Sequence, residues 1–284
     1  MPHGHPARDC IYLGDNLDAL AKLPDGSFQM VYADPPFNTG HTQRRTTLRT
    51  TSDADGSRVG FGGRRYNTAE GDSLAYPDDF ADYLEFLRPR LLEMWRVLDP
   101  TGTLYLHLDY REVHHVKVML DALVGRERFL NEIIWAYDYG ARSKRRWPAK
   151  HDTILVYVKD PDRYWFDSSA VDREPYMAPG LVTPAKAAVG KLPTDVWWHT
   201  IVSPTGKEKT GYPNQKPEGI VRRMMTASTR AGDRVLDCFA GSGTTGAVAQ
   251  QLGRGFVLVD ANPAAVEVMR SRLTGGPVDV VELP

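Results

Sequence analysis

The chain has 284 residues, 42% of them hydrophobic, and a formal net charge of −1. This length supports a substantial core in one large domain or in a domain with an inserted lobe, and the charge is not that of a simple DNA-coating protein. Two distant cysteines, Cys10 and Cys238, argue against a structural zinc site, and no apolar run approaches the roughly 20 residues that span a membrane. We expect a cytoplasmic protein with no metal and no membrane partner.

The first informative element is a buried strand predicted over residues 28–33, because this run is largely apolar. Asp34, Pro35, Pro36 and Phe37 follow at its carboxyl end, where open α/β sheets bind ligands. The prolines stiffen the turn and leave carbonyl oxygens as acceptors. With the carboxylate of Asp34 and the flat face of Phe37, the turn suits a planar ring that carries an exocyclic amino group, such as adenine or cytosine. The alternative is an ordinary turn that only ends a strand.

Residues 41–75 lack periodicity and are rich in Arg, Thr, Gly and Asp, which predicts a long mobile loop. Because this segment follows the Asp34 turn, we expect it to become ordered on nucleic acid and to close over the target base. The alternative is a solvated insert. The basic residues expected to contact phosphates here are Arg44, Arg45, Arg64 and Arg65.

The next stretch alternates helical and strand patterns, as an α/β domain does. The predicted elements are a helix over 79–98, a strand over 102–108, a helix over 112–124 and a strand over 131–137. Pro89 predicts a kink or break in the first of these helices. His114 and His115 are adjacent and cannot share one helix face, so they do not indicate a metal site.

Residues 138–203 depart from this rhythm and mix basic with aromatic side chains. Such a mixture suits contact with phosphates and bases. The alternative is a solvated basic loop in which Trp197 and Trp198 belong to the core. The residues that we expect to contact nucleic acid are Arg142, Lys144, Arg145, Arg146 and Trp147.

The end of the chain reads as a βαβ unit with a glycine-rich first turn. A strand over 234–237 leads into Gly241, Gly243 and Gly246, and a second strand ends at Asp260, where an acid would bind a ribose hydroxyl. The glycine spacing also matches a dinucleotide site, so a nicotinamide or flavin enzyme is an alternative.

Three residues favour S-adenosylmethionine over a dinucleotide. Asp237 precedes the glycine turn, where its charge would repel a pyrophosphate but could bind an ammonium group. Thr244 and Thr245 offer hydroxyl and N–H groups at a helix start, which suits a small carboxylate. A ligand with both an amino and a carboxylate group is an amino-acid cofactor.

Together, the early Asp-Pro-Pro-Phe and the late run from Leu236 to Thr245 resemble the amino-methylating DNA methyltransferases. The order, with the catalytic motif before the cofactor motif, is similar to their permuted β class, and the resemblance covers most of the chain. It implies a Rossmann-like α/β sheet, circularly permuted, with an inserted target-recognition region. The implied parts are a catalytic half over 1–137, a target-recognition region over 138–203 and a cofactor-binding half over 204–284.

The same resemblance implies further cofactor residues. Asp15 corresponds to the acid that faces the cofactor adenine, Lys216 to an element that borders its methionine end, and Phe239 to the aromatic of the glycine motif. Cys238 stands where the family often has proline, and Asn214 where it often has threonine. Neither change removes a charge, so we expect cofactor binding to survive both.

The expected reaction is methyl transfer from S-adenosylmethionine to the amino group of a flipped base in double-stranded DNA. Asp-Pro-Pro-Phe in this family more often implies adenine N6, and cytosine N4 is the alternative. The absence of a Pro-Cys nucleophile motif argues against carbon-5 methylation. RNA and protein-glutamine methyltransferases, an oxidoreductase and an inactive DNA-binding module are further alternatives. The resemblance also implies a homodimer, nucleoid association and a cognate restriction endonuclease as a cellular partner.

Overall fold

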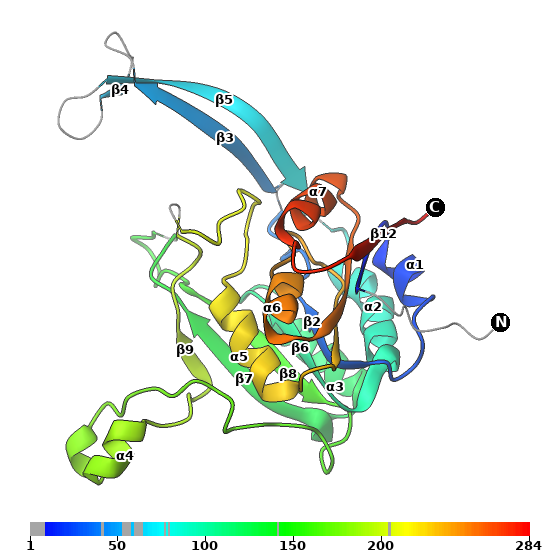
Figure 1. The fold of residues 1–284 in the computed structure, drawn as a ribbon, viewed down its shortest axis with the longest axis vertical. Coiled ribbons are helices and arrows are strands. Elements are labelled where there is room, and N and C mark those ends of the chain that lie inside the picture. The colour runs from blue at the N-terminus through cyan, green and yellow to red at the C-terminus, as the bar shows by residue number, and fades with distance from the viewer. Residues whose placement is uncertain are drawn as a thin grey trace.

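The computed structural model describes residues 9–40, 43–52, 58–59, 65–76, 78, 80–140, 142–203 and 206–284. A nine-stranded sheet in the order β12-β1-β11-β10-β2-β6-β8-β7-β9 forms its centre (Figure 1). All the strands from β12 to β6 in this order run parallel, whereas β8 runs antiparallel to both β6 and β7. The strands are β1 (Asp9–Leu13), β2 (Phe28–Ala33), β6 (Leu98–Leu108), β7 (Phe129–Ala136), β8 (His151–Val158), β9 (Val196–Trp198), β10 (Arg234–Asp237), β11 (Gly255–Asp260) and β12 (Val278–Glu282).

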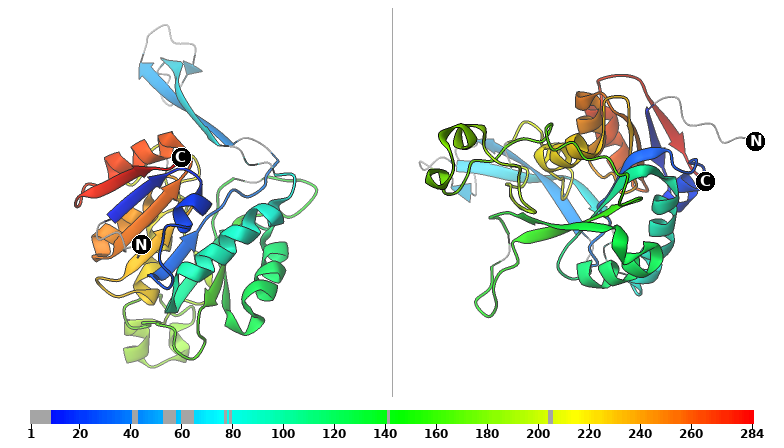
Figure 2. Two further views of the ribbon diagram at one scale, coloured as in Figure 1. Left: turned by 90° about the vertical axis from the view of Figure 1, so that its right-hand side faces the viewer. Right: turned by 90° about the horizontal axis from the view of Figure 1, so that it is seen from below.

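Helices cover both faces of this sheet, so the body has three layers (Figure 2). One buried cluster joins the sheet to α1 (Asn16–Leu20), α2 (Tyr83–Val97) and α3 (Val113–Val124). The second cluster joins the opposite face to α5 (Glu218–Ser228), α6 (Thr244–Leu252) and α7 (Pro263–Arg272). The predicted α/β class is therefore confirmed. No helix in the described part of the chain is long and apolar enough to cross a membrane.

Helix α2 shows how local sequence builds these layers. The Asp82 side chain caps it by accepting the Glu85 N–H at 3.0 Å, and Leu87, Leu91 and Met94 recur at helical spacing and are fully buried. The predicted break at Pro89 does not occur, because α2 continues through it to Val97. The apolar face of the helix outweighs the single hydrogen bond that proline removes.

The connections from β10 and β2 leave the sheet toward opposite faces. β10 continues into α6 on one face, and β2 connects to α2 on the other, although the two strands are neighbours. The carboxyl ends of β10 and β2 therefore form a topological switch point, which is where open α/β sheets bind ligands.

The segment 41–75 was predicted as a loop, and that prediction is wrong. It contains β3 (Gln43–Ser52), β4 (Arg58–Val59) and most of β5 (Arg65–Tyr76), which form a separate antiparallel sheet that projects from the body (Figure 1). A ribbon outside the core needs no apolar face, so the alternation of hydrophobic residues that predicts strands is missing. Its many threonines favour strands nonetheless, as the Thr50–Thr68 pair illustrates.

The ribbon is anchored directly after the Asp34 turn. Asp78 is buried, and its carboxylate accepts the Asn38 N–H and the Thr39 hydroxyl, both at 2.6 Å. Asn38 has a φ of 53° and its side-chain oxygen accepts the Phe80 N–H at 3.1 Å. Both ends of the ribbon are thus bound to one point beside the turn.

Residues 138–203 do not form a separate unit, because β8 lies in this range and pairs with β6 and β7 in the main sheet. The rest of this region runs over the surface and includes a short 3₁₀ turn (Pro179–Leu181), α4 (Pro184–Val189) and β9. Outside the region, a second 3₁₀ turn (Arg126–Arg128) precedes β7. Trp197 is buried in the core, whereas Trp198 is 77% exposed. The role of this region in target recognition stays a prediction.

Candidate active site

A cavity of about 520 Å³ opens at the switch point, within the range of small-molecule sites. Its walls come from the carboxyl ends of β1, β2, β10 and β11 and from the segment before α5. The predicted residues that line it are Asp15, Asp34, Pro35, Pro36, Phe37, Lys216, Asp237, Phe239, Gly241, Thr244, Thr245 and Asp260. Gly243 belongs to the same turn and precedes α6.

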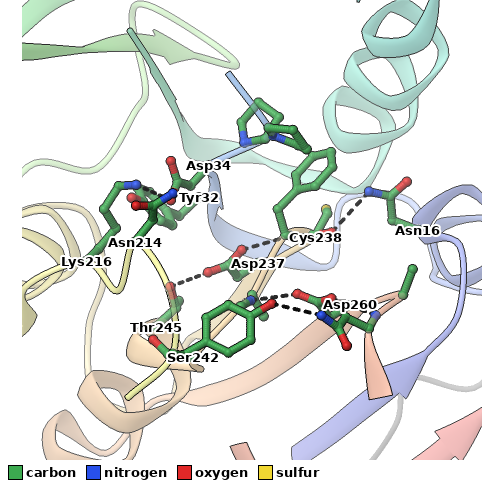
Figure 3. A pocket seen from close by; sticks show the side chains of 18 of the residues that line it. Asn16, Tyr32, Asp34, Asn214, Lys216, Asp237, Cys238, Ser242, Thr245 and Asp260 are labelled. Atoms are coloured by element: carbon green, nitrogen blue, oxygen red, sulfur yellow. Dashed lines mark hydrogen bonds and ion pairs between the residues drawn. The ribbon is translucent and has the colours of Figure 1, made fainter. Parts of the chain in front are cut away.

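Asp237 ends β10 and is 2% exposed. Its carboxylate accepts the Thr245 hydroxyl at 2.5 Å and the Phe239 N–H at 3.0 Å (Figure 3). Burial, reinforced by the charges of Asp34 and Asp260, raises the pKa of Asp237 to about 7 despite these hydrogen bonds. A cationic group in the cavity would stabilise the ionised form.

The glycine turn brings backbone close to the cavity. Gly243 has a φ of 71°, and a Cβ there would lie 2.8 Å from Met269 Cγ. Asp260 ends β11, and its carboxylate accepts the Gly241 N–H and the Asn262 N–H, both at 2.8 Å. Burial raises the pKa of Asp260 as well. The second acid therefore both braces the turn and faces the cavity.

The two threonines are bound differently from the prediction. The Thr245 hydroxyl donates to Asp237, and the Thr244 hydroxyl donates to the Lys216 carbonyl at 3.0 Å. Both side chains thus brace the site from within. Helix α6 begins here, and the N–H groups of a first helical turn have no partner inside the helix. These N–H groups, rather than the hydroxyls, are suited to a carboxylate.

The opposite wall carries residues that the sequence did not single out. Arg90 binds the carboxylate of Asp15 at 2.8 Å and the side-chain oxygen of Asn16 at 2.7 Å, and its guanidinium lies 3.9 Å from the centre of the Phe86 ring. The Phe86 ring in turn lies 6.4 Å from that of Phe239. This polar and aromatic wall suits a flat, nitrogen-rich ring. Helical periodicity marks Phe86 and Arg90 only as parts of α2.

The Asp34 turn forms the other end of the cavity (Figure 3). Lys216 binds Asp34 Oδ2 at 2.6 Å, and its ammonium lies 4.9 Å from the centre of the Phe37 ring. Asp34 Oδ1 is buried and has no hydrogen-bond donor among the described residues, and His107 Nδ1 lies 3.9 Å from it. The site thus presents one neutralised carboxylate with one open acceptor.

These features fit an amino-acid cofactor with an adenine ring. Asp237 is a buried acid suited to an ammonium group, Gly241 lines the cavity, and the Phe86 wall suits a ring. Among the described residues, no group of three or more potential ligands could hold a metal ion.

The residues predicted to contact DNA lie apart from the cavity. The five predicted residues after β7 are all exposed, and Trp147 is 95% exposed. They are Arg142, Lys144, Arg145, Arg146 and Trp147. They follow β7, which runs parallel to β2, so they emerge at the same edge of the sheet as Asp34. Of the residues predicted in 41–75, three lie in the ribbon and one lies outside the described residues. Those in strands are Arg44, Arg45 and Arg65, and the one outside is Arg64.

The chain matches a family model named for N6 and N4 methyltransferases and described as DNA methylase, over residues 28–271. It is 30% identical over 257 residues to Type II methyltransferase M.HpaI of Haemophilus parainfluenzae, which covers 90% of this chain and 71% of the relative. It is 28% identical over 278 residues to DNA adenine methyltransferase YhdJ of Escherichia coli strain K12, and this match covers 95% of this chain and 84% of the relative.

Solved structures share the fold. The PvuII DNA methyltransferase, described as cytosine-N4-specific, superposes with a TM-score of 0.62 at 15% identity, over 98% of this chain and 97% of that chain. Two further structures, each with a TM-score of 0.59 and 19% identity, are complexes with S-adenosylmethionine.

Proposed function

The chain belongs to the DNA methylase family whose model matches residues 28–271, and we propose that it methylates the N6 amino group of adenine in double-stranded DNA. The enzyme is an S-adenosylmethionine-dependent DNA methyltransferase that acts on an exocyclic amine. What the family leaves open is the base, the residues that act on it and the contacts with DNA.

The open acceptor on Asp34 carries the proposal. A stacked base cannot reach the cavity, so the target must first be flipped out of the helix. Asp34 Oδ1, buried and without a hydrogen-bond donor among the described residues, would accept one amino hydrogen, and the Pro35 carbonyl would accept the other. Phe37 would stack on the ring. This arrangement aims the nitrogen lone pair into the cavity, which is a positioning and electrostatic effect.

Lys216 offsets the negative charge of Asp34 while the base is bound, because its ammonium contacts the other oxygen at 2.6 Å. Asp34 need not be a strong base, since the N-methylated ammonium is acidic and readily loses its proton.

S-adenosylmethionine supplies the electrophilic methyl group when it is bound. Asp237 would hold its ammonium group, and the N–H groups at the start of α6 its carboxylate. Asp260 would accept from the ribose, and Asp15 and the Phe86 wall would border the adenine. A pyrophosphate would meet the negative charge of Asp237, which disfavours a nucleotide-linked oxidoreductase.

Adenine is favoured by the acid in Asp-Pro-Pro-Phe and by the similarity to a DNA adenine methyltransferase. Cytosine N4 is the second candidate, because the same geometry would hold its amino group. The exposed basic residues at the same edge of the sheet as Asp34 support DNA as the substrate, and Arg142 to Trp147 and the arginines of the ribbon are the proposed contacts.

The homodimer and the cognate endonuclease also remain proposals that follow from the resemblance. Light scattering that shows only a monomer would refute the dimer.

The deciding experiment is nucleoside mass spectrometry of DNA incubated with the protein and S-adenosylmethionine. We expect N6-methyladenine; N4-methylcytosine would overturn the base assignment, and methylation of RNA alone would overturn the substrate. Asp34→Ala should abolish turnover while calorimetry shows cofactor binding intact. Asp18→Ala removes an exposed acid from α1 and is the matched control. Strong residual methylation by Asp34→Ala would refute the role of this residue.

A further inference from the structure

A buried chain of polar groups lies behind Asp34. His107 on β6 is fully buried, and its Nε2 lies 3.2 Å from Asp152 Oδ2 on β8. Its Nδ1 lies 2.8 Å from the hydroxyl of Tyr32 on β2, and Tyr137 donates to Asp152 Oδ1 at 3.0 Å. Three adjacent strands of the sheet thus contribute to one network at the edge that carries the Asp34 turn.

The network favours one tautomer of the imidazole. Burial acts to raise the pKa of Asp152, but hydrogen bonds from His107 and Tyr137 and the charge of Lys216 hold that pKa below its ordinary value. An ionised carboxylate only accepts, so Nε2 of His107 carries the hydrogen. Burial raises the pKa of Tyr32 well above its ordinary value, so its hydroxyl keeps a proton, which it can donate to Nδ1 in the Nε2–H tautomer.

This tautomer matters because Nδ1 also lies 3.9 Å from Asp34 Oδ1. With a lone pair on Nδ1, the imidazole cannot donate to that oxygen. A hydrogen on Nδ1 would place a donor beside both the Tyr32 hydroxyl and Asp34 Oδ1, and would compete with the substrate amine for that acceptor.

We propose that Asp152 and His107 are positioning residues that hold the imidazole as the Nε2–H tautomer, so that Asp34 Oδ1 stays open for the amino hydrogen of the target base. The inference rests on the proposed role of Asp34. A purely structural network would stabilise the three strands without affecting methyl transfer. The two possibilities therefore differ in the rate of methyl transfer that they predict for variants with an altered His107 tautomer, and the ¹⁵N NMR spectrum of histidine reports that tautomer.

Asp152→Asn is the test, because the amide has the shape of the carboxylate. Tyr137 donates to Oδ1, which orients the amide oxygen toward Tyr137 and the amide nitrogen toward His107 Nε2. The nitrogen then donates to Nε2 and moves the imidazole hydrogen to Nδ1, as the same exchange does in serine proteases. We expect ¹⁵N NMR of histidine-labelled protein to show this change of tautomer, and single-turnover methyl transfer to slow at least about tenfold with cofactor affinity within about twofold.

Asp121→Asn is the matched control, since this carboxylate on α3 also accepts from a tyrosine, Tyr157 at 2.5 Å, and is not among the described residues that line the cavity. It should leave tautomer and rate unchanged. Tyr32→Phe is a second variant in case Asp152→Asn does not fold. It removes the donor to Nδ1 while Asp152 still accepts from Nε2, so we expect the imidazole to gain a second proton on Nδ1, beside Asp34, and transfer to slow.

An inverted tautomer with the wild-type transfer rate would overturn the inference, and so would an Asp152→Asn protein that keeps the Nε2–H form. If wild-type protein methylates DNA and both variants do so equally well, only this inference fails. If wild-type protein methylates no nucleic acid, the proposed function fails, and the histidine spectrum alone decides whether Asp152 controls the tautomer.

Discussion

Cofactor affinity should fall in acid, because Asp237 must be ionised to bind an ammonium group. This carboxylate is 2% exposed, and burial, with the charges of Asp34 and Asp260 added, raises its pKa to about 7. Below pH 7 the protein without cofactor therefore holds a proton on Asp237. Binding of an ammonium group favours the ionised form and must displace that proton.

The size of the effect follows from this pKa. With a pKa of about 7, half of the Asp237 side chains are ionised at pH 7 and about one tenth at pH 6. The apparent Kd should therefore rise about fivefold from pH 7 to pH 6 and approach tenfold for each further unit. Binding should release close to one proton at pH 6 and about half a proton at pH 7. Over this range the amino group of the cofactor itself stays protonated.

Isothermal titration calorimetry at pH 6 and 7, in two buffers that differ in ionisation enthalpy, measures the apparent Kd and the number of protons released on binding. The matched ligand is 5′-methylthioadenosine, which lacks the amino-acid end and should bind with no dependence on the ionisation of Asp237. Asp237→Asn should bind S-adenosylmethionine weakly and independently of pH in this range. An affinity that is constant between pH 6 and 7, with no proton released, would refute the assignment of Asp237 to the ammonium group.

Two further predictions concern the catalytic turn and the glycine turn. Lys216→Met removes the ammonium bound to Asp34, and we expect single-turnover transfer to slow on the order of 10²-fold, whereas Lys216→Arg, which keeps the charge, should be less impaired. Gly243→Ala should lower the free energy of unfolding by about 2–4 kcal/mol, because a strained φ of 71° combines with contact at 2.8 Å to Met269. Gly253 has a similar φ of 69°, but a Cβ there would have no atom within 4 Å. Gly253→Ala should therefore lower the free energy of unfolding, measured in urea, by only about 1–2 kcal/mol. Equal losses for the two glycine variants would rule out the packing contribution.

The sequence predicts the cofactor half of the fold closely, and the reason is local. β10 has the predicted bounds, 234–237, and β11 ends at Asp260 as predicted, since strand, glycine turn, helix and terminal acid follow one another within a short segment. The helix begins at Thr244, as expected from the two threonines at its start, and the side chains of Thr244 and Thr245 bind its first turn to neighbouring segments. β12 was not predicted; all of its residues are partly or fully exposed at the sheet edge, so it lacks a buried strand pattern.

The residues that sequence reasoning missed act through contacts between distant segments. Arg90 reaches Asp15 across 75 positions, and His107 reaches Asp152 across 45. Periodicity assigns Arg90 to a helix and His107 to a strand, but it cannot tell which neighbours the fold supplies. The buried His107 within an apolar strand was the one available signal, because a polar side chain inside a core needs a partner.

The two acids of the cavity differ in how the protein neutralises them, and this difference separates their roles. Asp34 already has the ammonium of Lys216 at 2.6 Å, so it gains little from a cationic ligand and is suited to a neutral amine. Asp237 accepts hydrogen bonds from Thr245 and from a backbone N–H, but within the described residues it forms no ion pair. A charged ligand group therefore stabilises Asp237 more than Asp34. Loss of Asp34 should reduce the rate at unchanged cofactor affinity, whereas loss of Asp237 should first reduce the affinity, so that saturating cofactor restores transfer in Asp237→Asn but not in Asp34→Ala.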